Sequence, residues 1–129
     1  MLPLVVAAPA RRSTILVVED EVLIRIAICD ELREVGYLAI EAVNADEALG
    51  LLQSNIDVDL IFSDVRMPGA TDGLGLLAEV RKAYPQMPVI ITSGHLPSDT
   101  KFDHPTDFLS KPYNVELAVN LIQNRLKYL

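Results

Sequence analysis

The sequence of 129 residues contains no tryptophan, only one cysteine and few basic residues. A single cysteine, Cys29, excludes an internal disulfide and a zinc site built from cysteine and histidine ligands. Lys and Arg number 11 against 18 Asp and Glu, a net charge of −7, which disfavours direct binding to nucleic acid or to an anionic membrane. No apolar run approaches the roughly 20 residues that span a bilayer. These absences indicate a reduced, cytoplasmic protein, and the length predicts one domain.

The first 12 residues differ in character from the remainder. Residues 1–10 are largely apolar and are followed by Arg11 and Arg12. A secretory signal carries its positive charge before the apolar run, so this order argues against export. We therefore interpret residues 1–12 as a flexible N-terminal tail and residues 13–129 as the folded domain.

Beyond the tail, short apolar runs alternate with helical patterns. The runs are rich in Val, Ile and Leu without a polar residue at every second position, as is typical of strands buried on both faces. We expect strands near 14–18, 37–43, 60–62, 89–91 and 107–110, and helices near 21–35, 45–53, 73–84 and 114–126. This alternation predicts an α/β fold with a five-stranded parallel sheet and helices on both faces.

Apolar periodicity also assigns a buried side to each predicted helix. Cys29 falls within the first helix, where we expect it to be a small structural residue, and His104 is also interpreted as structural. The expected buried positions are Ile24, Ile28, Leu32 and Val35 in the first helix, Ala48, Leu51 and Leu52 in the second, Leu74, Leu77 and Val80 in the third, and Leu117, Leu121 and Ile122 in the last.

Polar residues follow four of the predicted strands. Glu19 and Asp20 follow the first, Asp64 the third, Ser93 the fourth and Lys111 the fifth. Each one alone fits a local role, such as helix capping by Asp20 or support of a turn by Asp64. Parallel strands bring their carboxyl ends to one edge, and ligands of open α/β sheets bind there. We therefore expect these five side chains to share one pocket.

The chemistry of this set suits phosphoryl transfer. Three neighbouring carboxylates repel one another, and a divalent cation removes that penalty. Ligands that are all oxygen favour a hard ion, and Mg²⁺ is the usual one beside phosphate. A carboxylate beside the ion can attack phosphorus, while Lys111 neutralises charge and Ser93 hydrogen-bonds a phosphoryl oxygen. The set suits reception of a phosphoryl group and lacks a base placed for general hydrolysis.

Four segments carry a resemblance to a known family. They are 15–21 (ILVVEDE), 60–69 (LIFSDVRMPG), 88–94 (PVIITSG) and 107–113 (DFLSKPY). In this order they resemble the CheY-like receiver domain of two-component response regulators, and the resemblance covers residues 13–129. It implies a doubly wound sheet with the strand order 2-1-3-4-5, whose ligand lies at the switch point between strands 1 and 3.

The resemblance also implies the roles of the polar residues. Asp64 would be the phosphoacceptor that forms an aspartyl phosphate. Glu19, Asp20 and Asp64 would bind Mg²⁺ together with the backbone carbonyl of Arg66. Lys111 would pair with the phosphoryl group.

Further residues are implied to couple the phosphoryl group to a conformational switch. Ser93 would be the switch hydroxyl, and Phe108 the switch aromatic, which moves inward when Ser93 moves toward the phosphate. The Lys111–Pro112 peptide bond would be cis, an isomer that is inexpensive only before proline. In this fold the side chains of Arg66 and His95 would flank the phosphoryl group on Asp64. They either tune the lifetime of that group or are solvated loop residues.

Several features depart from the usual family pattern, including Ser93 and Gly94 where Thr and Ala are commoner, and Phe108, which lacks the hydroxyl of a tyrosine. Glu19 is longer than the usual aspartate and can hold the metal through water. The loop at 70–73 looks one residue longer than usual. The interval from Ser93 to Lys111 is short, contains Pro97 and Pro105, and has little helical periodicity. We therefore predict that the fourth helix of the family is very short or absent here.

These features together predict a stand-alone response regulator that catalyses only its own phosphorylation and dephosphorylation. Its donor would be a sensor histidine kinase or a histidine phosphotransfer protein, its output would pass to another protein, and a weak homodimer stays open. A phosphatase like the haloacid dehalogenases would need an acid where Arg66 stands. A flavodoxin-like module would need amide donors where the carboxylates crowd. A degenerate receiver that takes no phosphate is the last alternative.

Overall fold

Five parallel strands form one sheet in the computed structural model, which describes residues 12–127. The tail expected at residues 1–12 lies outside the described residues except for Arg12. The strand order is β2-β1-β3-β4-β5, which confirms the predicted topology. The strands are β1 (Thr14–Val18), β2 (Leu38–Ala42), β3 (Leu60–Asp64), β4 (Val89–Ser93) and β5 (Thr106–Ser110).

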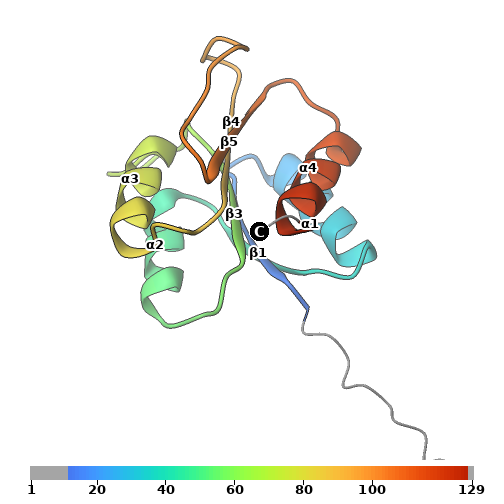
Figure 1. Cartoon of the computed structure of the whole chain (residues 1–129), viewed down its shortest axis with the longest axis horizontal. Helices are drawn as coiled ribbons and strands as arrows, with labels where there is room; N and C mark the ends of the chain where they lie inside the picture. The colour runs from blue at the N-terminus through green and yellow to red at the C-terminus, as the bar shows by residue number, and fades with distance from the viewer. Residues whose placement is uncertain (1–11, 128–129) are drawn as a thin grey trace, which may run out of the picture.

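Four helices cover the two faces of this sheet. They are α1 (Val22–Glu34), α2 (Ala45–Gln53), α3 (Gly73–Ala83) and α4 (Val115–Lys127). Helices α2 and α3 lie on one face, and α1 and α4 lie on the other (Figure 1), so the sheet is the middle of three layers. The predicted doubly wound α/β architecture is confirmed. In the described part of the chain, no helix has the length and apolar character needed to cross a bilayer.

Strands β1, β3 and β4 are buried along their whole length. Alternate residues of a strand point to opposite faces, so Leu16 and Val18 pack with α2 and α3, whereas Ile15 and Val17 pack with α1 and α4. Side chains on both faces of these strands are covered by helices. This explains why apolar residues do not alternate with polar ones along them.

The buried side of α3 differs from the predicted one. Leu76 is 1% exposed and Val80 is also buried, whereas Leu74 is 38% exposed. The run Gly-Leu-Gly-Leu-Leu at 73–77 offers two overlapping apolar stripes, so periodicity alone does not choose between them. The close contact of Gly73 with the backbone at the end of β3 determines which stripe is buried. The side of α3 that carries Gly73 faces the sheet.

The remaining helices depart from the expected faces at single positions. In α4, Leu117 is exposed, because the small side chain of Ala118 lets that side of the helix approach the sheet. In α1, Val35 is exposed because it is the C-cap and lies beyond the last helical residue. The buried positions are Ile28, Cys29 and Leu32 in α1, Ala45, Ala48 and Leu52 in α2, and Ala118, Val119 and Ile122 in α4.

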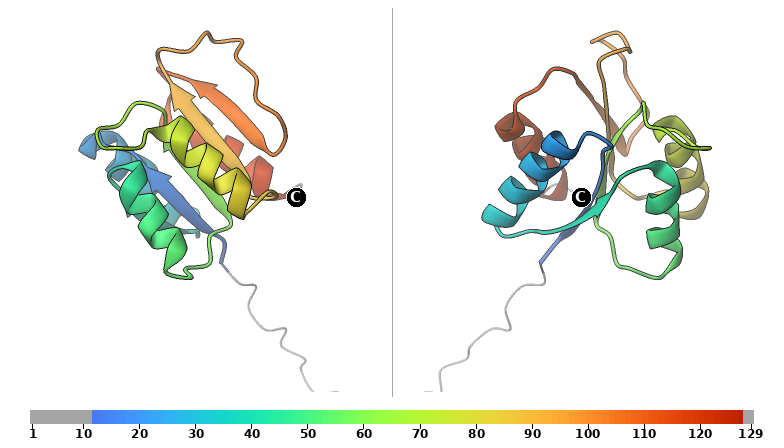
Figure 2. Two further views of the ribbon diagram at one scale, coloured as in Figure 1. Left: turned by 90° about the vertical axis from the view of Figure 1, so that its left-hand side faces the viewer. Right: turned by 180° about the vertical axis from the view of Figure 1, so that it is seen from behind.

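The connection between β4 and β5 contains no helix, which confirms that part of the prediction. Residues 94–105 arch from the end of β4 back to the start of β5 (Figure 2). Leu96 and Phe102 from this connection pack against the core on the side of α2 and α3, where Phe108 also packs. The ring centroids of Phe102 and Phe108 lie 6.2 Å apart. The connection thus adds a few apolar side chains to this face of the sheet in place of a helix.

The corrected face of α3 yields a test of the fold. Leu76→Ala removes a fully buried side chain and is expected to lower the free energy of unfolding by about 2–5 kcal/mol. Leu74→Ala, two residues away and more than a third exposed, is expected to change it by less than about 1 kcal/mol. Urea denaturation of both variants measures the difference, and the opposite ranking would contradict this placement of α3.

Candidate functional site

The carboxyl ends of β1 and β3 bring three acidic side chains together. Val18 pairs with Ser63 in the parallel ladder, so Glu19 and Asp64 come next to each other at the same edge. One carboxylate oxygen from each of Glu19, Asp20 and Asp64 lies within 4.8 Å of the others. Glu19 and Asp64 are buried, whereas Asp20 is exposed. The three acids that the sequence places at strand ends therefore form one cluster with one open side.

Lys111 connects two of these acids. Its Nζ donates to Asp64 Oδ2 at 2.8 Å and to Glu19 Oε1 at 3.2 Å. Its backbone N–H donates to the carbonyl of Ser93 at 2.9 Å, which ties the end of β5 to the end of β4. The structure thus brings the predicted lysine into direct contact with the acidic cluster. The peptide bond between Lys111 and Pro112 is cis.

The backbone around Asp64 is held by close packing. The N–H of Val65 donates to Asp64 Oδ1 at 2.8 Å and to the carbonyl of Thr92 at 3.0 Å. A Cβ on Gly73 would lie 2.0 Å from the carbonyl oxygen of Asp64, so only glycine permits α3 to begin there. The Asp64 side chain is therefore oriented by the residues that follow it and by the start of α3.

Ser93 lies at the end of β4 with its hydroxyl turned to the following connection. Ser93 Oγ accepts hydrogen bonds from the N–H of His95 at 3.0 Å and of Leu96 at 3.3 Å. Phe108, in the neighbouring strand β5, is half-buried and contacts Phe102. The hydroxyl and the aromatic ring therefore both contact the connection between β4 and β5.

Arg66 and His95 are both exposed. Arg66 lines an open hollow of about 410 Å³ together with Asp20 and Asp72, so its side chain lies beside the exposed acid of the cluster. The side chain of His95 is exposed, and its backbone N–H is bound to Ser93. The structure thus places Arg66 close to the cluster and His95 at its margin.

The pKa values of Glu19 and Lys111, which contact each other in the pocket, are both raised. Burial raises the pKa of Glu19 to about 7, and the charge of Asp64 adds to this shift while Lys111 opposes it. Burial lowers the pKa of Lys111, but its hydrogen bond to Asp64 and the charge of Glu19 outweigh this effect, so the net shift is upward. Lys111 therefore stays charged at neutral pH, whereas the raised pKa of Glu19 lies near neutral pH.

The donor atoms of the cluster fit a hard divalent cation. Glu19, Asp20 and Asp64 offer only carboxylate oxygens, and Asp20 leaves one side open to solvent. Mg²⁺ prefers such ligands, keeps several waters and is bound in proteins by one or a few carboxylates beside phosphate. The pKa of Glu19 is raised mainly by burial, and a dication would offset the further contribution from the charge of Asp64. The acidic pocket is thus compatible with Mg²⁺.

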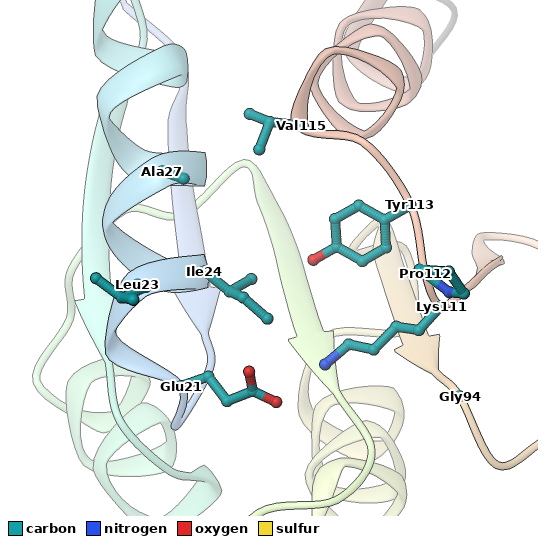
Figure 3. Close-up of a pocket in the computed structure, with 9 residues that line it drawn as sticks. All are labelled: Glu21, Leu23, Ile24, Ala27, Gly94, Lys111, Pro112, Tyr113 and Val115. Atoms are coloured by element: carbon teal, nitrogen blue, oxygen red, sulfur yellow. The ribbon is translucent and has the colours of Figure 1, made fainter.

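An apolar groove of about 560 Å³ begins beside this pocket and runs between α1 and the segment that follows β5. Glu21 and Lys111 lie at one end of it, and the Lys111 ammonium points toward the end of β3 (Figure 3). Leu23 is 83% exposed on its rim. The groove is lined by Leu23, Ile24, Ala27, Pro112, Tyr113 and Val115.

Comparison with known proteins identifies the family. The sequence model of the family described as the response regulator receiver domain matches residues 15–123 of this chain. The chain belongs to this family. The receiver-domain interpretation of the sequence is thereby confirmed, and it is favoured over the phosphatase and flavin-module alternatives.

Individual relatives agree with this assignment. The transcriptional regulator NtrC of Salmonella typhimurium is 32% identical over 122 residues, which cover 92% of this chain and 26% of NtrC. The crystal structure of the receiver domain of the hybrid histidine kinase CckA is 34% identical, with a TM-score of 0.76, and the match covers 88% of this chain and 99% of that domain. The chain spans 26% or less of the length of the first curated relatives it matches.

A third relative was solved with a ligand. The response regulator TrrA of Thermotoga maritima, in complex with Mg²⁺-BeF, is 29% identical with a TM-score of 0.76, over 88% of this chain and 98% of TrrA. Receiver domains of this family bind Mg²⁺ at an acidic pocket and take phosphoryl groups from histidine kinases.

Three residues of the site were not found from the sequence. Gly73 was expected only as the start of a helix, and its contact with the Asp64 backbone is a tertiary one. Tyr113 packs edge-on against Phe62 at a centroid distance of 5.9 Å and forms one wall of the groove. Arg25 donates to the carbonyl of Glu19, six residues earlier, and its position in the first turn of α1 was the available signal, because that turn directly follows the acidic pair.

The raised pKa of Glu19 leads to a prediction about the metal-free protein. Its folded-state pKa of about 7 exceeds the ordinary value of 4.5, so the stability that Glu19 contributes at low pH is lost as pH rises through about 7. Glu19→Gln removes this titration and is expected to raise the free energy of unfolding by about 1–3 kcal/mol near pH 8, and by much less near pH 5.

Urea denaturation in the presence of EDTA measures this dependence at both pH values. Asp99→Asn, which makes the same change of charge in the exposed β4–β5 connection, is the control and is expected to show no such trend. A Glu19→Gln variant less stable than the parent near pH 8 would contradict the destabilising charge that the raised pKa assigns to this carboxyl.

Proposed function

We propose that Asp64 accepts a phosphoryl group and that this step depends on Mg²⁺ bound by Glu19, Asp20, Asp64 and the carbonyl of Arg66. The observation that carries the proposal is the contact of Asp64 with Lys111 inside a cluster of three carboxylates. A carboxylate is a weak nucleophile, so it needs a neutralised phosphoryl group and correct orientation more than it needs a base. The pocket supplies both.

The proposed step is a displacement at phosphorus. One Oδ of Asp64 forms the new P–O bond while the P–N bond of a phosphohistidine donor breaks, and the electron pair of that bond stays on the imidazole. The step needs no separate base, because the attacking group is a carboxylate oxygen of Asp64, whose Oδ2 accepts a hydrogen bond from the Lys111 ammonium. Bound Mg²⁺ would supply positive charge for the phosphoryl oxygens. Lys111 then pairs with a phosphoryl oxygen in place of Asp64 Oδ2.

The surface beside the pocket supports a protein donor. Leu23 stands almost fully exposed next to the apolar groove, and the groove ends at Lys111. A sensor histidine kinase or a histidine phosphotransfer protein can bury this surface while it presents phosphohistidine to Asp64. A small phosphodonor can reach the open side of the pocket without using the groove.

The contacts of Ser93 and Phe108 support a conformational response. Ser93 Oγ now accepts two amide N–H groups from the β4–β5 connection. In the proposed switch, Ser93 turns its hydroxyl to a phosphoryl oxygen, and Phe108 moves inward from its contact with Phe102. Phosphorylation would thereby shift the population of the connection toward a second arrangement that an output protein recognises. Self-catalysed dephosphorylation returns the domain to its starting state.

The phosphoacceptor is tested with a small phosphodonor. Incubation with acetyl phosphate and Mg²⁺ is expected to add one phosphoryl group, and the P–O bond to acetate breaks in this case. Asp64→Asn is expected to abolish the mass gain, because an amide does not displace acetate. Intact-mass spectrometry before and after treatment with base measures the change, since an acyl phosphate is base-labile.

The control for this experiment is Asp99→Asn, which leaves the pocket intact and is expected to be labelled like the parent. Omission of Mg²⁺ with EDTA is expected to prevent labelling. Equal labelling of the parent and Asp64→Asn would move the acceptor to another residue, and no labelling of either would favour a degenerate receiver.

The lifetime of the phosphoryl group is tested at the two exposed positions. Arg66 lies beside Asp20, where its guanidinium can pair with a phosphoryl oxygen and hinder water. An exposed ion pair is worth up to about 1 kcal/mol, so Arg66→Ala is expected to speed decay by up to about fivefold. We expect His95→Ala to have a smaller effect. Decay after removal of the donor is the measurement, with Lys101→Ala as control. Unchanged decay in both variants would leave Arg66 and His95 as solvated loop residues.

A further inference from the structure

Arg25 lies on the first turns of α1 and contacts the backbone of the acidic pocket. Its NH1 donates to the carbonyl of Glu19 at 2.9 Å, and its Nε donates to Glu41 Oε1 at 3.1 Å. The Arg25 side chain is only 12% exposed. A guanidinium that is nearly buried and makes two charge-assisted hydrogen bonds has a defined position.

The carbonyl of Glu19 belongs to the peptide unit that joins Glu19 to Asp20. Because a peptide unit is planar, a bond to this carbonyl sets the rotation of the whole unit. That rotation determines the directions in which the side chains of both acids leave the backbone. The N–H of Glu19 is held as well, since it donates to the carbonyl of Ala42 at 3.0 Å. Arg25 therefore completes the restraint on the two acids that precede α1.

Glu41 gives this arrangement its charge balance. A bare guanidinium beside three carboxylates would compete with a dication for them and weaken its binding. Glu41, on the edge strand β2, pairs with Arg25 through Oε1 at 3.1 Å and with the more exposed Arg33 through Oε2 at 3.4 Å. Its carboxylate therefore offsets part of the charge of Arg25, whose NH1 stays bonded to the carbonyl of Glu19. The net effect of the pair is thus orientation of the acids rather than addition of positive charge.

We propose that Arg25, oriented by Glu41, is a positioning residue for divalent-cation binding by Glu19 and Asp20. The inference rests on the proposed function, because it assigns Arg25 to the same metal site. Partners in the outer shell of metal sites typically change metal affinity by about 10- to 100-fold when they are removed. We expect Arg25→Met to raise the Kd for Mg²⁺ at least about tenfold.

The experiment measures the Kd for Mg²⁺ directly, without phosphorylation. Amide chemical shifts of the full chain are followed by NMR during a titration with MgCl₂, and the thermal midpoint in EDTA is recorded for each variant. Arg25→Lys keeps the charge and one donor to the Glu19 carbonyl, so it is expected to restore part of the affinity. Glu41→Gln is expected to weaken binding less than Arg25→Met, because Arg25 remains but loses its counter-charge.

Arg81 provides a matched control. It is a half-buried arginine of α3 that donates to the carbonyl of Met87 and to Thr106 Oγ1, at the opposite ends of the strands. Arg81→Met is expected to lower the thermal midpoint in EDTA and leave the Kd for Mg²⁺ unchanged.

The outcomes separate this inference from the proposed function. A Kd for Arg25→Met within about twofold of that for Arg81→Met, in a parent chain that binds Mg²⁺, would overturn the role of Arg25 alone. A parent chain without a Mg²⁺-dependent shift would overturn the metal site itself and the inference with it. A tenfold weaker Kd with partial recovery in Arg25→Lys supports positioning by Arg25.

Discussion

The contact of the Lys111 ammonium with Asp64 and Glu19 is the constraint on which the site depends. Parallel strands deliver Glu19 and Asp64 to one edge, and their burial there removes the solvent that would screen them. Without the Lys111 ammonium, nothing would oppose the upward shift in the pKa of Glu19 that its burial and the charge of Asp64 produce. Lys111 reaches them from β5 because its backbone N–H is tied to Ser93 at the end of β4. Part of the negative charge of the pocket is therefore compensated by a lysine that the sheet itself positions.

The fold and the centre of the site could be predicted because both follow from the strands. An apolar strand without polar alternation has helices on both faces, so the parallel sheet and its layers follow from short-range pattern. Once the strands are parallel, Asp64 and Lys111 lie at the same edge of the sheet, and the strand order, with only β4 between β3 and β5, brings them within reach of each other. Proline at 97 and 105 likewise disfavoured a helix after β4 without any tertiary information.

The missed features all depend on contacts between elements. The leucines of α3 fit two faces equally well, and the choice was made by the approach of Gly73 to the carbonyl of Asp64. In the sequence, Arg25 has the character of an ordinary surface residue of a helix. Its contact with the carbonyl of Glu19 depends on the turn before α1, which the sequence pattern does not specify. Such contacts depend on angles between elements that no periodicity encodes, so sequence reasoning reaches the acids but not the groups that orient them.

The β4–β5 connection links the site to the surface without a helix. A helix holds its own backbone hydrogen bonds, so a displacement at its start moves it as a unit. In residues 94–105 the first amide groups are instead held by Ser93 Oγ, and the later apolar side chains, Leu96 and Phe102, are held by packing. A rotation of the Ser93 side chain toward a phosphoryl group would break its hydrogen bonds to those amides. Phe102 would then be free to move together with Phe108, whose ring it contacts. The response of this domain would therefore be a change of loop conformation around two aromatic rings rather than a rigid shift of a helix.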